Sequence, residues 1–290
     1  MLEFIQHCLN GLIIGGAYAL IGVGMTMVLG IMRVINFAHG EFYMLGAYLC
    51  FSLATMLGLN FFVGFSLAVL GVGVIGCMVE RIVLKPLRGR ELNTNMLAMI
   101  GVSIALSNIA LIVWGAVPQA IASPFPAQNI EILGLSFTPF RLFIMGTAIV
   151  IIVVVHSFIQ YTMHGKSMRA SFQDMEMASM LGVRVDRVYP ITFGMGAAMA
   201  AVAGILLGVM FSLKPTMGEF AVSRAFAVVI LGGMGSFPGA ILGGLILGLS
   251  ENLAAAYISS GFKDAIAFML IVAILIFKPN GLMAVSVNKK

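Results

Sequence analysis

TMHGKSMRASFQDMEMASMLGVRVDRVY, at residues 162–189, is the longest clearly polar interval in an otherwise apolar chain. It lies between two long hydrophobic segments and is too short to form a domain. Ser171 followed three residues later by Asp174 resembles a capping box, and Gly182 is a residue type at which helices commonly end. The pattern predicts one short helix, Phe172 to Leu181, outside the hydrocarbon core of a membrane.

The apolar residues of this helix fall on two sides of a helical wheel. Phe172 and Met175 share one side, and Met177, Met180 and Leu181 share the other. An ordinary solvated loop helix with scattered methionines is one interpretation. Because a surface helix needs only one buried side, the other interpretation is a helix held between its own membrane domain and a partner. Our hypothesis is that another protein drives or senses the chain here.

Composition defines the class of protein. The chain has 290 residues, of which 61% are hydrophobic and 9% charged, whereas about a quarter of the residues in soluble proteins are charged. Apolar runs of about 20 residues predict an all-α polytopic membrane protein and exclude an outer-membrane barrel. The net charge of +5 comes mainly from short loops and indicates no nucleic-acid partner. Cys8, Cys50 and Cys77 have neither metal-site nor disulfide spacing and are interpreted as packing residues.

The apolar runs predict about eight transmembrane helices, with short broken helices in addition. The predicted spans are Phe4–Ile31, Phe42–Leu57, Phe61–Val79, Asn95–Trp114, Phe140–Tyr161, Pro190–Leu213, 237–258 and Ala265–Phe277.

The basic residues predict the orientation of these spans. If residues 80–93, residues 162–189, Arg33 and the tail with Lys278, Lys289 and Lys290 face the cytoplasm, 12 of the 16 lysines and arginines lie there. The loop 116–139, which contains no lysine or arginine, then lies outside, as does the N-terminus. A cytoplasmic C-terminus requires an odd number of crossings after residue 213, so Arg224–Gly235 is expected to cross as a short half-helix. The alternative is a re-entrant loop, which would leave the tail outside.

Two interrupted segments, INFAHGEF and ILGGMGSFPG, occur one in each half of the chain. Because the first and sixth segments would run in opposite directions, this arrangement is typical of an inverted repeat whose broken helices line a transport path. The alternative is that the glycines only permit close helix packing. The predicted single membrane domain comprises a first repeat at 4–115, a linking loop and helix at 116–161, the loop 162–189 and a second repeat at 190–278. The candidate path residues are Asn36, His39, Gly40, Glu41, Gly232, Gly233, Gly235 and Pro238.

No motif for catalysis or cofactor binding is recognisable. Gly165-Lys166-Ser167 resembles the end of a phosphate-binding loop, but Gln160 stands where that motif needs glycine. His39 with Glu41 fits a proton relay or, as we favour, a structural cap on a broken helix. We therefore predict a transport subunit that is not an enzyme and has no cofactor or metal, with any ATP hydrolysed by a partner.

Several motifs together carry a resemblance to a known family. They are GGAYALIGVGMTMVLGIMRVINFAHGEFYMLGAY, ERIVLKPLR, GKSMRASFQDMEMASMLGVRVDRV, GAAMAAVAGILLG, AFAVVILGGMGSFPGAILGGLILGLSENL and KPNGL. Over nearly its whole length the chain resembles the branched-chain amino-acid ATP-binding-cassette (ABC) importer permeases of the LivH type.

The resemblance implies a type II ABC importer fold in a bacterial inner membrane. With the orientation predicted from the loop charges, the N-terminus would be periplasmic and the C-terminus cytoplasmic. The implied partners are a second, LivM-like permease, two ATP-binding subunits and a periplasmic substrate-binding protein, and the implied substrates are leucine, isoleucine and valine. Residues 165–187 would contain a coupling helix seated on an ATPase. The expected coupling residues are Arg169, Phe172, Asp174, Met175, Met177, Met180, Leu181 and Gly182.

Two rival functions remain open at this stage. Permeases for urea and short-chain amides share much of this pattern. A secondary amino-acid transporter that works alone on an ion gradient belongs to another class, and a purely structural membrane subunit is disfavoured by the paired interruptions.

Overall fold

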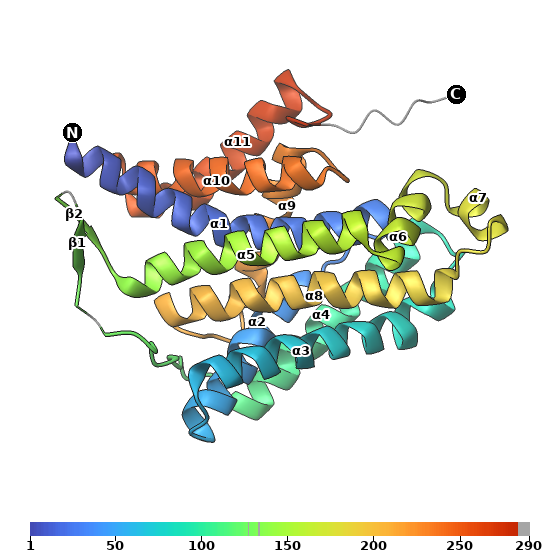
Figure 1. Cartoon of the computed structure of the whole chain (residues 1–290), viewed down its shortest axis with the longest axis horizontal. Helices are drawn as coiled ribbons and strands as arrows, with labels where there is room; N and C mark the ends of the chain where they lie inside the picture. The colour runs from blue at the N-terminus through green and yellow to red at the C-terminus, as the bar shows by residue number, and fades with distance from the viewer. Residues whose placement is uncertain (127, 133, 284–290) are drawn as a thin grey trace.

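The computed structural model describes residues 1–126, 128–132 and 134–283, which form a helical bundle with one small β-hairpin (Figure 1). Lys289 and Lys290, counted above with the C-terminal tail, lie outside the described residues. The helices are α1 (Leu2–Met32), α2 (His39–Phe51), α3 (Phe61–Val79), α4 (Leu92–Trp114), α5 (Pro139–Tyr161), α6 (Met163–Gln173), α7 (Met175–Met180), α8 (Val185–Met210), α9 (Met217–Gly232), α10 (Phe237–Tyr257) and α11 (Lys263–Phe277). The hairpin consists of β1 (Ile130–Ile132) and β2 (Leu135–Phe137), which pair antiparallel.

The predicted helical membrane fold is confirmed. Among the described residues, six helices are long and apolar enough to cross a membrane, namely α1, α3, α4, α5, α8 and α10, and α11 contains a shorter apolar run. The helices α2 and α9 have 13 and 16 residues and span only about 20 and 24 Å. They are the short half-helices of the fold.

Three predicted boundaries were wrong, each because polarity was taken for a helix end. The span expected at Phe42–Leu57 begins at His39, and its last turn, Ser52–Met56, is a π-helix. Pro190 lies inside α8, because the polar residues before it belong to the same helix. The half-helix expected from Arg224 begins at Met217, since the Arg224 side chain is paired inside the bundle.

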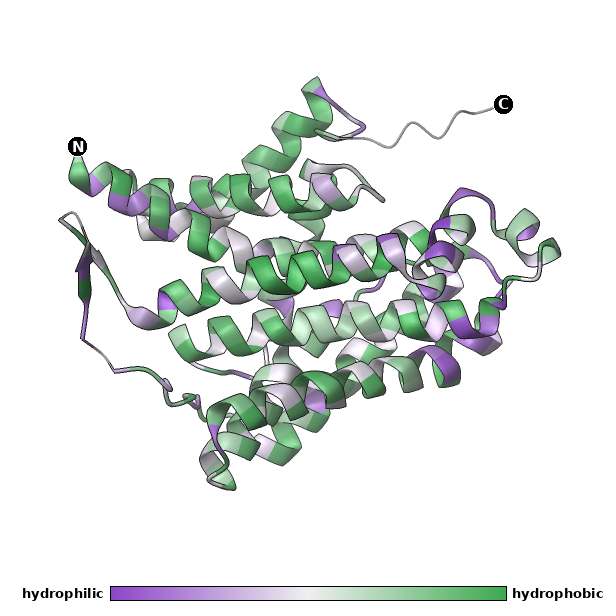
Figure 2. Ribbon diagram, viewed as in Figure 1, coloured by the Kyte–Doolittle hydropathy of each residue, from purple (hydrophilic) through white to green (hydrophobic). Residues whose placement is uncertain are grey.

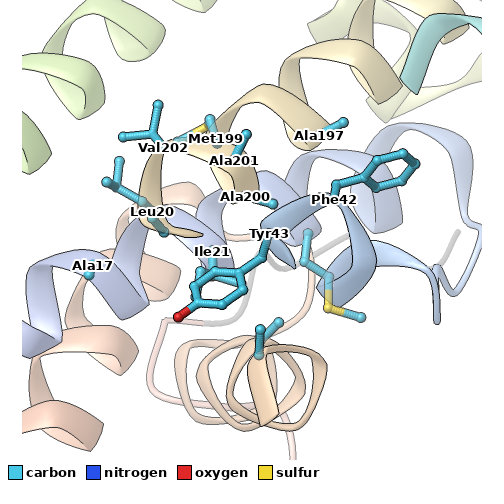
Figure 3. Close-up of a cluster of buried hydrophobic side chains, with 14 of the residues drawn as sticks. Ala17, Leu20, Ile21, Phe42, Tyr43, Ala197, Met199, Ala200, Ala201 and Val202 are labelled. Atoms are coloured by element: carbon cyan, nitrogen blue, oxygen red, sulfur yellow. The ribbon is translucent and has the colours of Figure 1, made fainter. Parts of the chain in front are cut away.

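The centre of the bundle is formed by α1 and α8. In each helix 78% of the most apolar 18-residue window is buried, against 11% for α4 and 17% for α5. The outer helices α3, α4 and α5 instead expose large aliphatic side chains, as expected for surfaces that contact lipid, and Figure 2 shows hydrophobic residues along their length. Figure 3 shows α1, α2 and α8 meeting through Leu20, Phe42, Tyr43 and Ala200.

The packing of the helices has an internal symmetry. α1 packs on α8, α9 and α10, while α8 packs on α1, α2 and α3. Exchanging α1 with α8, α2 with α9, α3 with α10 and α4 with α11 maps α2 on α3 to α9 on α10 and α2 on α4 to α9 on α11. The contact of α10 with α11 is not matched by an equally close contact of α3 with α4. Because α8 starts at the end of the bundle where α1 finishes, the two helices run in opposite directions (Figure 1). The fold is therefore an inverted repeat.

The polar segments separate to the two ends of the bundle. At one end Gln6 exchanges two hydrogen bonds of 2.9 Å with the backbone of Ser136, so the N-terminus holds the hairpin. At the other end Arg88 pairs with Asp186 at 2.6 Å and Gly281 lies against Gly233. The N-terminus and the Gly233–Gly281 contact thus lie toward opposite ends of α1, whereas the short helix α9 crosses the direction of the long helices (Figure 1).

Close approach of α2 and α8 should make Gly204 intolerant of a side chain. A Cβ at Gly204 would overlap the Tyr43 carbonyl, which is backbone and has little freedom to move. We expect Gly204→Ala to destabilise the detergent-purified protein by about 1–3 kcal/mol, seen as a lower thermal unfolding midpoint. Gly146→Ala is the matched control, because nothing lies within 4 Å of its added Cβ. Equal midpoints for the two variants would contradict this packing.

Candidate functional site

The polar segment between α5 and α8 forms two short helices that meet at Asp174. α6 ends at Gln173, Asp174 is extended with φ −152° and ψ 112°, and its Oδ1 accepts the Met177 N–H at 3.0 Å. The prediction of one helix over Phe172–Leu181 capped by Ser171 was therefore wrong. Ser171 is buried in the last turn of α6, and the capping residue lies three positions later.

The end of α7 is formed as predicted. Gly182 follows α7 with φ +88°, a conformation that glycine adopts without strain, and its N–H donates to the Ser179 carbonyl. The chain then turns back toward the start of α8.

The apolar residues of α6 and α7 divide into inward and outward sets. The Phe172 ring lies against the backbone of both Gly30 and Gly235, and Met175 borders a small hollow with Tyr189. Ala178 is also buried.

The outward set consists of Met177, Met180 and Leu181, whose exposed fractions are 60%, 79% and 86%. On a helix these three positions span about 100° of the face opposite Met175 and Ala178. Figure 1 shows α7 as the outermost helix at its end of the bundle. The chain thus presents a small apolar surface, Met177–Met180–Leu181, which we call the α7 face.

Arg169 does not belong to the α7 face. Its Nη1 donates to the Ile159 and Gln160 carbonyls at 2.7 and 2.8 Å. These are among the last carbonyls of α5, which have no partner within their own helix. Arg169 therefore holds α6 against the end of α5. Of the two polar residues predicted to take part in coupling, Arg169 and Asp174, only Asp174 lies next to α7.

The first predicted interruption lies inside the bundle. Asn36, His39 and Glu41 are 1%, 0% and 3% exposed. His39 Nε2 is 3.0 Å from the Ile21 carbonyl oxygen, and Ser103 Oγ donates to Glu41 Oε1 at 3.1 Å. These bonds fit the structural reading of His39, which bonds a backbone carbonyl beside the broken helix.

The second predicted interruption lies at the end of the bundle that carries α7. Gly232 and Gly239 touch backbone to backbone, and Ser236 Oγ accepts the Gly239 N–H at 3.1 Å. Pro238 occupies the first turn of α10, where proline's missing N–H costs no helix bond. The N–H groups of residues 282 and 283 donate to the carbonyls of residues 231 and 232. The end of the KPNGL segment and the residue that follows it therefore satisfy the end of α9.

The structure does not bring the two interruptions together. His39 lies beside Gly24 of α1, whereas Gly235 faces Gly30 across the Phe172 ring. Six residues of helix separate Gly24 and Gly30, which is about 9 Å. By the symmetry of the fold, the break before α2 corresponds to the break before α9.

The equivalent pair of half-helix starts was missed by sequence reasoning. His39-Gly40-Glu41-Phe42 opens α2, and Met217-Gly218-Glu219-Phe220 opens α9. The two starts touch, because a Cβ on Gly40 would meet the Gly218 carbonyl and a Cβ on Gly218 would meet the Glu41 carboxyl. The repeated Gly-Glu-Phe was the signal in the sequence that could have paired them.

A buried charged network was also missed. Arg224 Nε of α9 donates to Glu251 Oε1 of α10 at 3.2 Å, and Tyr18 Oη of α1 donates to Glu251 Oε2 at 2.8 Å. The guanidinium also lies 3.7 Å from the centre of the Phe220 ring. Both charged side chains are 5% exposed. An arginine and a glutamate within apolar helices were the available signal, since such residues rarely occur there unpaired.

Comparison with known proteins identifies the family. Residues 7–275 match the family model described as "Branched-chain amino acid transport system / permease component". The chain belongs to this family. It is 39% identical over 97% of its length to the high-affinity branched-chain amino acid transport system permease protein LivH of Salmonella typhimurium and of Escherichia coli, covering 96% of each. It is 34% identical to BraD of Pseudomonas aeruginosa, again over 97% of its length and 96% of the relative.

A solved structure shares the fold. PsaBC from Streptococcus pneumoniae in complex with Fab aligns with a TM-score of 0.56 at 12% identity, covering 96% of this chain and 93% of that one. At that identity the likeness supports the architecture and carries no information on substrate.

Proposed function

We propose that the chain is the permease subunit of an ABC importer that moves leucine, isoleucine and valine across the bacterial inner membrane. The observation that carries this proposal is the full-length likeness to LivH and BraD, both named for branched-chain amino acid transport. Partner ATPases and a substrate-binding protein would complete the transporter, together with a second, LivM-like permease.

The α7 face supplies the contact through which a partner ATPase would act. It is apolar, exposed and held by Phe172, whose ring touches both the end of α1 and the α9–α10 turn. A displacement of α6 and α7 would therefore reach both halves of the inverted repeat through one side chain. The half-helix starts at Gly40 and Gly218, with Asn36, His39 and Glu41, would line the transport path between the two halves.

The same arrangement supports an orientation in the membrane. The end of the bundle with α7 carries most of the basic loop residues, which in bacterial membrane proteins favours the cytoplasmic side. The N-terminus and the β-hairpin would then face the periplasm and meet the binding protein.

Reconstitution tests the function. Proteoliposomes containing this chain, the two ATPases and the second permease should accumulate labelled leucine only with ATP inside the compartment that holds the ATPases and with loaded binding protein on the opposite side. Excess isoleucine or valine should compete with leucine, and excess urea should not. Uptake by this chain alone under a proton or sodium gradient would contradict the proposal and favour the secondary transporter.

A further inference from the structure

A cavity of about 370 Å³ lies between α1, α2, α8, α9 and α10, at the start of α9. This volume lies near the lower end of the range for small-molecule sites in proteins. The cavity is separate from the α7 face. Its lining includes Lys214 and Thr216, which lie in the segment between α8 and α9.

One part of the lining is apolar. Ile14, Leu207, Met217 and Phe220 come from three helices and supply aliphatic and aromatic surface. Such a wall would remove a short hydrocarbon side chain from water, which contributes about 0.8 kcal/mol for each buried CH₂ group.

Another part of the lining is polar and held in place. Glu251 borders the cavity while Tyr18 and Arg224 fix its carboxylate at 2.8 and 3.2 Å. Each carboxylate oxygen can accept more than one hydrogen bond, so a ligand ammonium at this wall would share the Glu251 carboxylate with its existing partners. The Asn252 amide, next along α10, lines the same space and can both donate and accept.

A positive group stands at the exposed side of the cavity. Lys214 is exposed and lines the cavity, as does the exposed Thr216. An ammonium and a hydroxyl are both donors that suit a carboxylate. The cavity therefore combines an anionic group, donors for an anion and an apolar wall, which are the three features that an aliphatic amino acid requires.

We propose that this cavity binds one aliphatic amino acid in its zwitterionic form, within a single permease chain. The ammonium group lies toward Glu251, the carboxylate toward Lys214 and Thr216, and the side chain against the apolar wall. The ligand class rests on the proposed function, because it is the class that the transporter would carry. The site would hold substrate briefly after release from the binding protein.

The test is direct binding of labelled leucine to the purified full-length chain in lipid nanodiscs, without ATPases or binding protein. Leucine should bind saturably. Isoamylamine, which lacks the carboxylate, and 4-methylpentanoate, which lacks the ammonium, should each compete at least tenfold more weakly, because each loses a charge-assisted hydrogen bond of about 1.5–3 kcal/mol. Competition by either analogue as strong as that by leucine would overturn the zwitterionic assignment.

Variants locate the site. Glu251→Gln should weaken leucine binding at least tenfold, and Thr216→Trp, at an exposed position, should obstruct the cavity without changing the buried network. Gln128→Trp is the matched control, since Gln128 is exposed in the loop at the same end and does not line this cavity. Unchanged leucine binding in a folded Thr216→Trp protein would overturn the proposal.

The leucine-binding experiment and the uptake experiment can fail independently of each other. Absent leucine binding to the chain alone, with ATP-driven uptake intact in the full assembly, would refute the cavity site and leave the transporter function standing. Leucine binding without uptake in any assembly would do the reverse.

Discussion

Met180→Asp should abolish ATP-driven uptake while the protein still inserts and folds normally. Met180 is 79% exposed and belongs to the α7 face, so the substitution removes little internal packing. In a complex it would place a charge in an apolar contact, where loss of one hot-spot side chain costs about 2 kcal/mol, or roughly 30-fold in affinity. We expect uptake in reconstituted vesicles to fall at least tenfold, with an unchanged thermal unfolding midpoint.

Ser179→Asp is the matched control for that variant. It adds the same charge at an exposed position one residue away on α7, about 100° around the helix from Met180, and removes no apolar group. It should retain most of the uptake. Met175 is unsuitable for the same test, because its partly buried side chain borders the hollow with Tyr189 and an aspartate there would disturb folding as well. Normal uptake by Met180→Asp at normal expression would refute the coupling role of the α7 face.

The parts of the fold predicted well are those set by local hydropathy. The span expected at Phe61–Val79 coincides with α3, and those expected at Asn95–Trp114 and Phe140–Tyr161 differ from α4 and α5 only at their first residues. Lipid accepts only long apolar helices, so the length of an apolar run is a direct signal of a crossing. The same reasoning fails where a polar group is satisfied inside the protein, as Arg224 is within α9.

The candidate site was predicted less completely, for two physical reasons. Ser171 and Asp174 both have side chains able to cap a helix, and in the fold Asp174 caps α7 while Ser171 is buried within α6. The packing of Phe172 against Gly30 and Gly235, which accompanies this arrangement, depends on residues far away in the sequence. The pairing of half-helices depends on three-dimensional symmetry. Gly218 lies in a stretch without the glycine cluster found at 232–235, yet its contact with the start of α2 defines the equivalent break.

Arg224→Leu and Glu251→Leu should each destabilise the protein strongly, and the double variant should recover most of the loss. The two charges are buried 27 residues apart in sequence on neighbouring helices, with side chains 5% exposed. Removing one member of such a pair leaves the other charged in an apolar interior, which typically costs about 3–5 kcal/mol, whereas replacing both by apolar residues is often nearly neutral. The measurement is a double-mutant cycle of thermal unfolding midpoints in detergent, together with the yield of inserted protein.

The control for this cycle is the exposed ion pair between Lys85 and Asp186. Their charged groups lie 3.4 Å apart, and the two side chains are 52% and 66% exposed. Water solvates each partner when the other is lost, so Lys85→Leu should change the unfolding midpoint little. If the single variants at Arg224 and Glu251 behaved like Lys85→Leu, water would reach this pair and the network would not be a buried link. If instead the double variant folds stably but no longer binds leucine, the charges serve the cavity that Glu251 lines more than the stability of the bundle. In that case the Arg224–Glu251 pair would be needed for leucine binding but not for a stable fold. A pair that only joined α9 to α10 would not give this result.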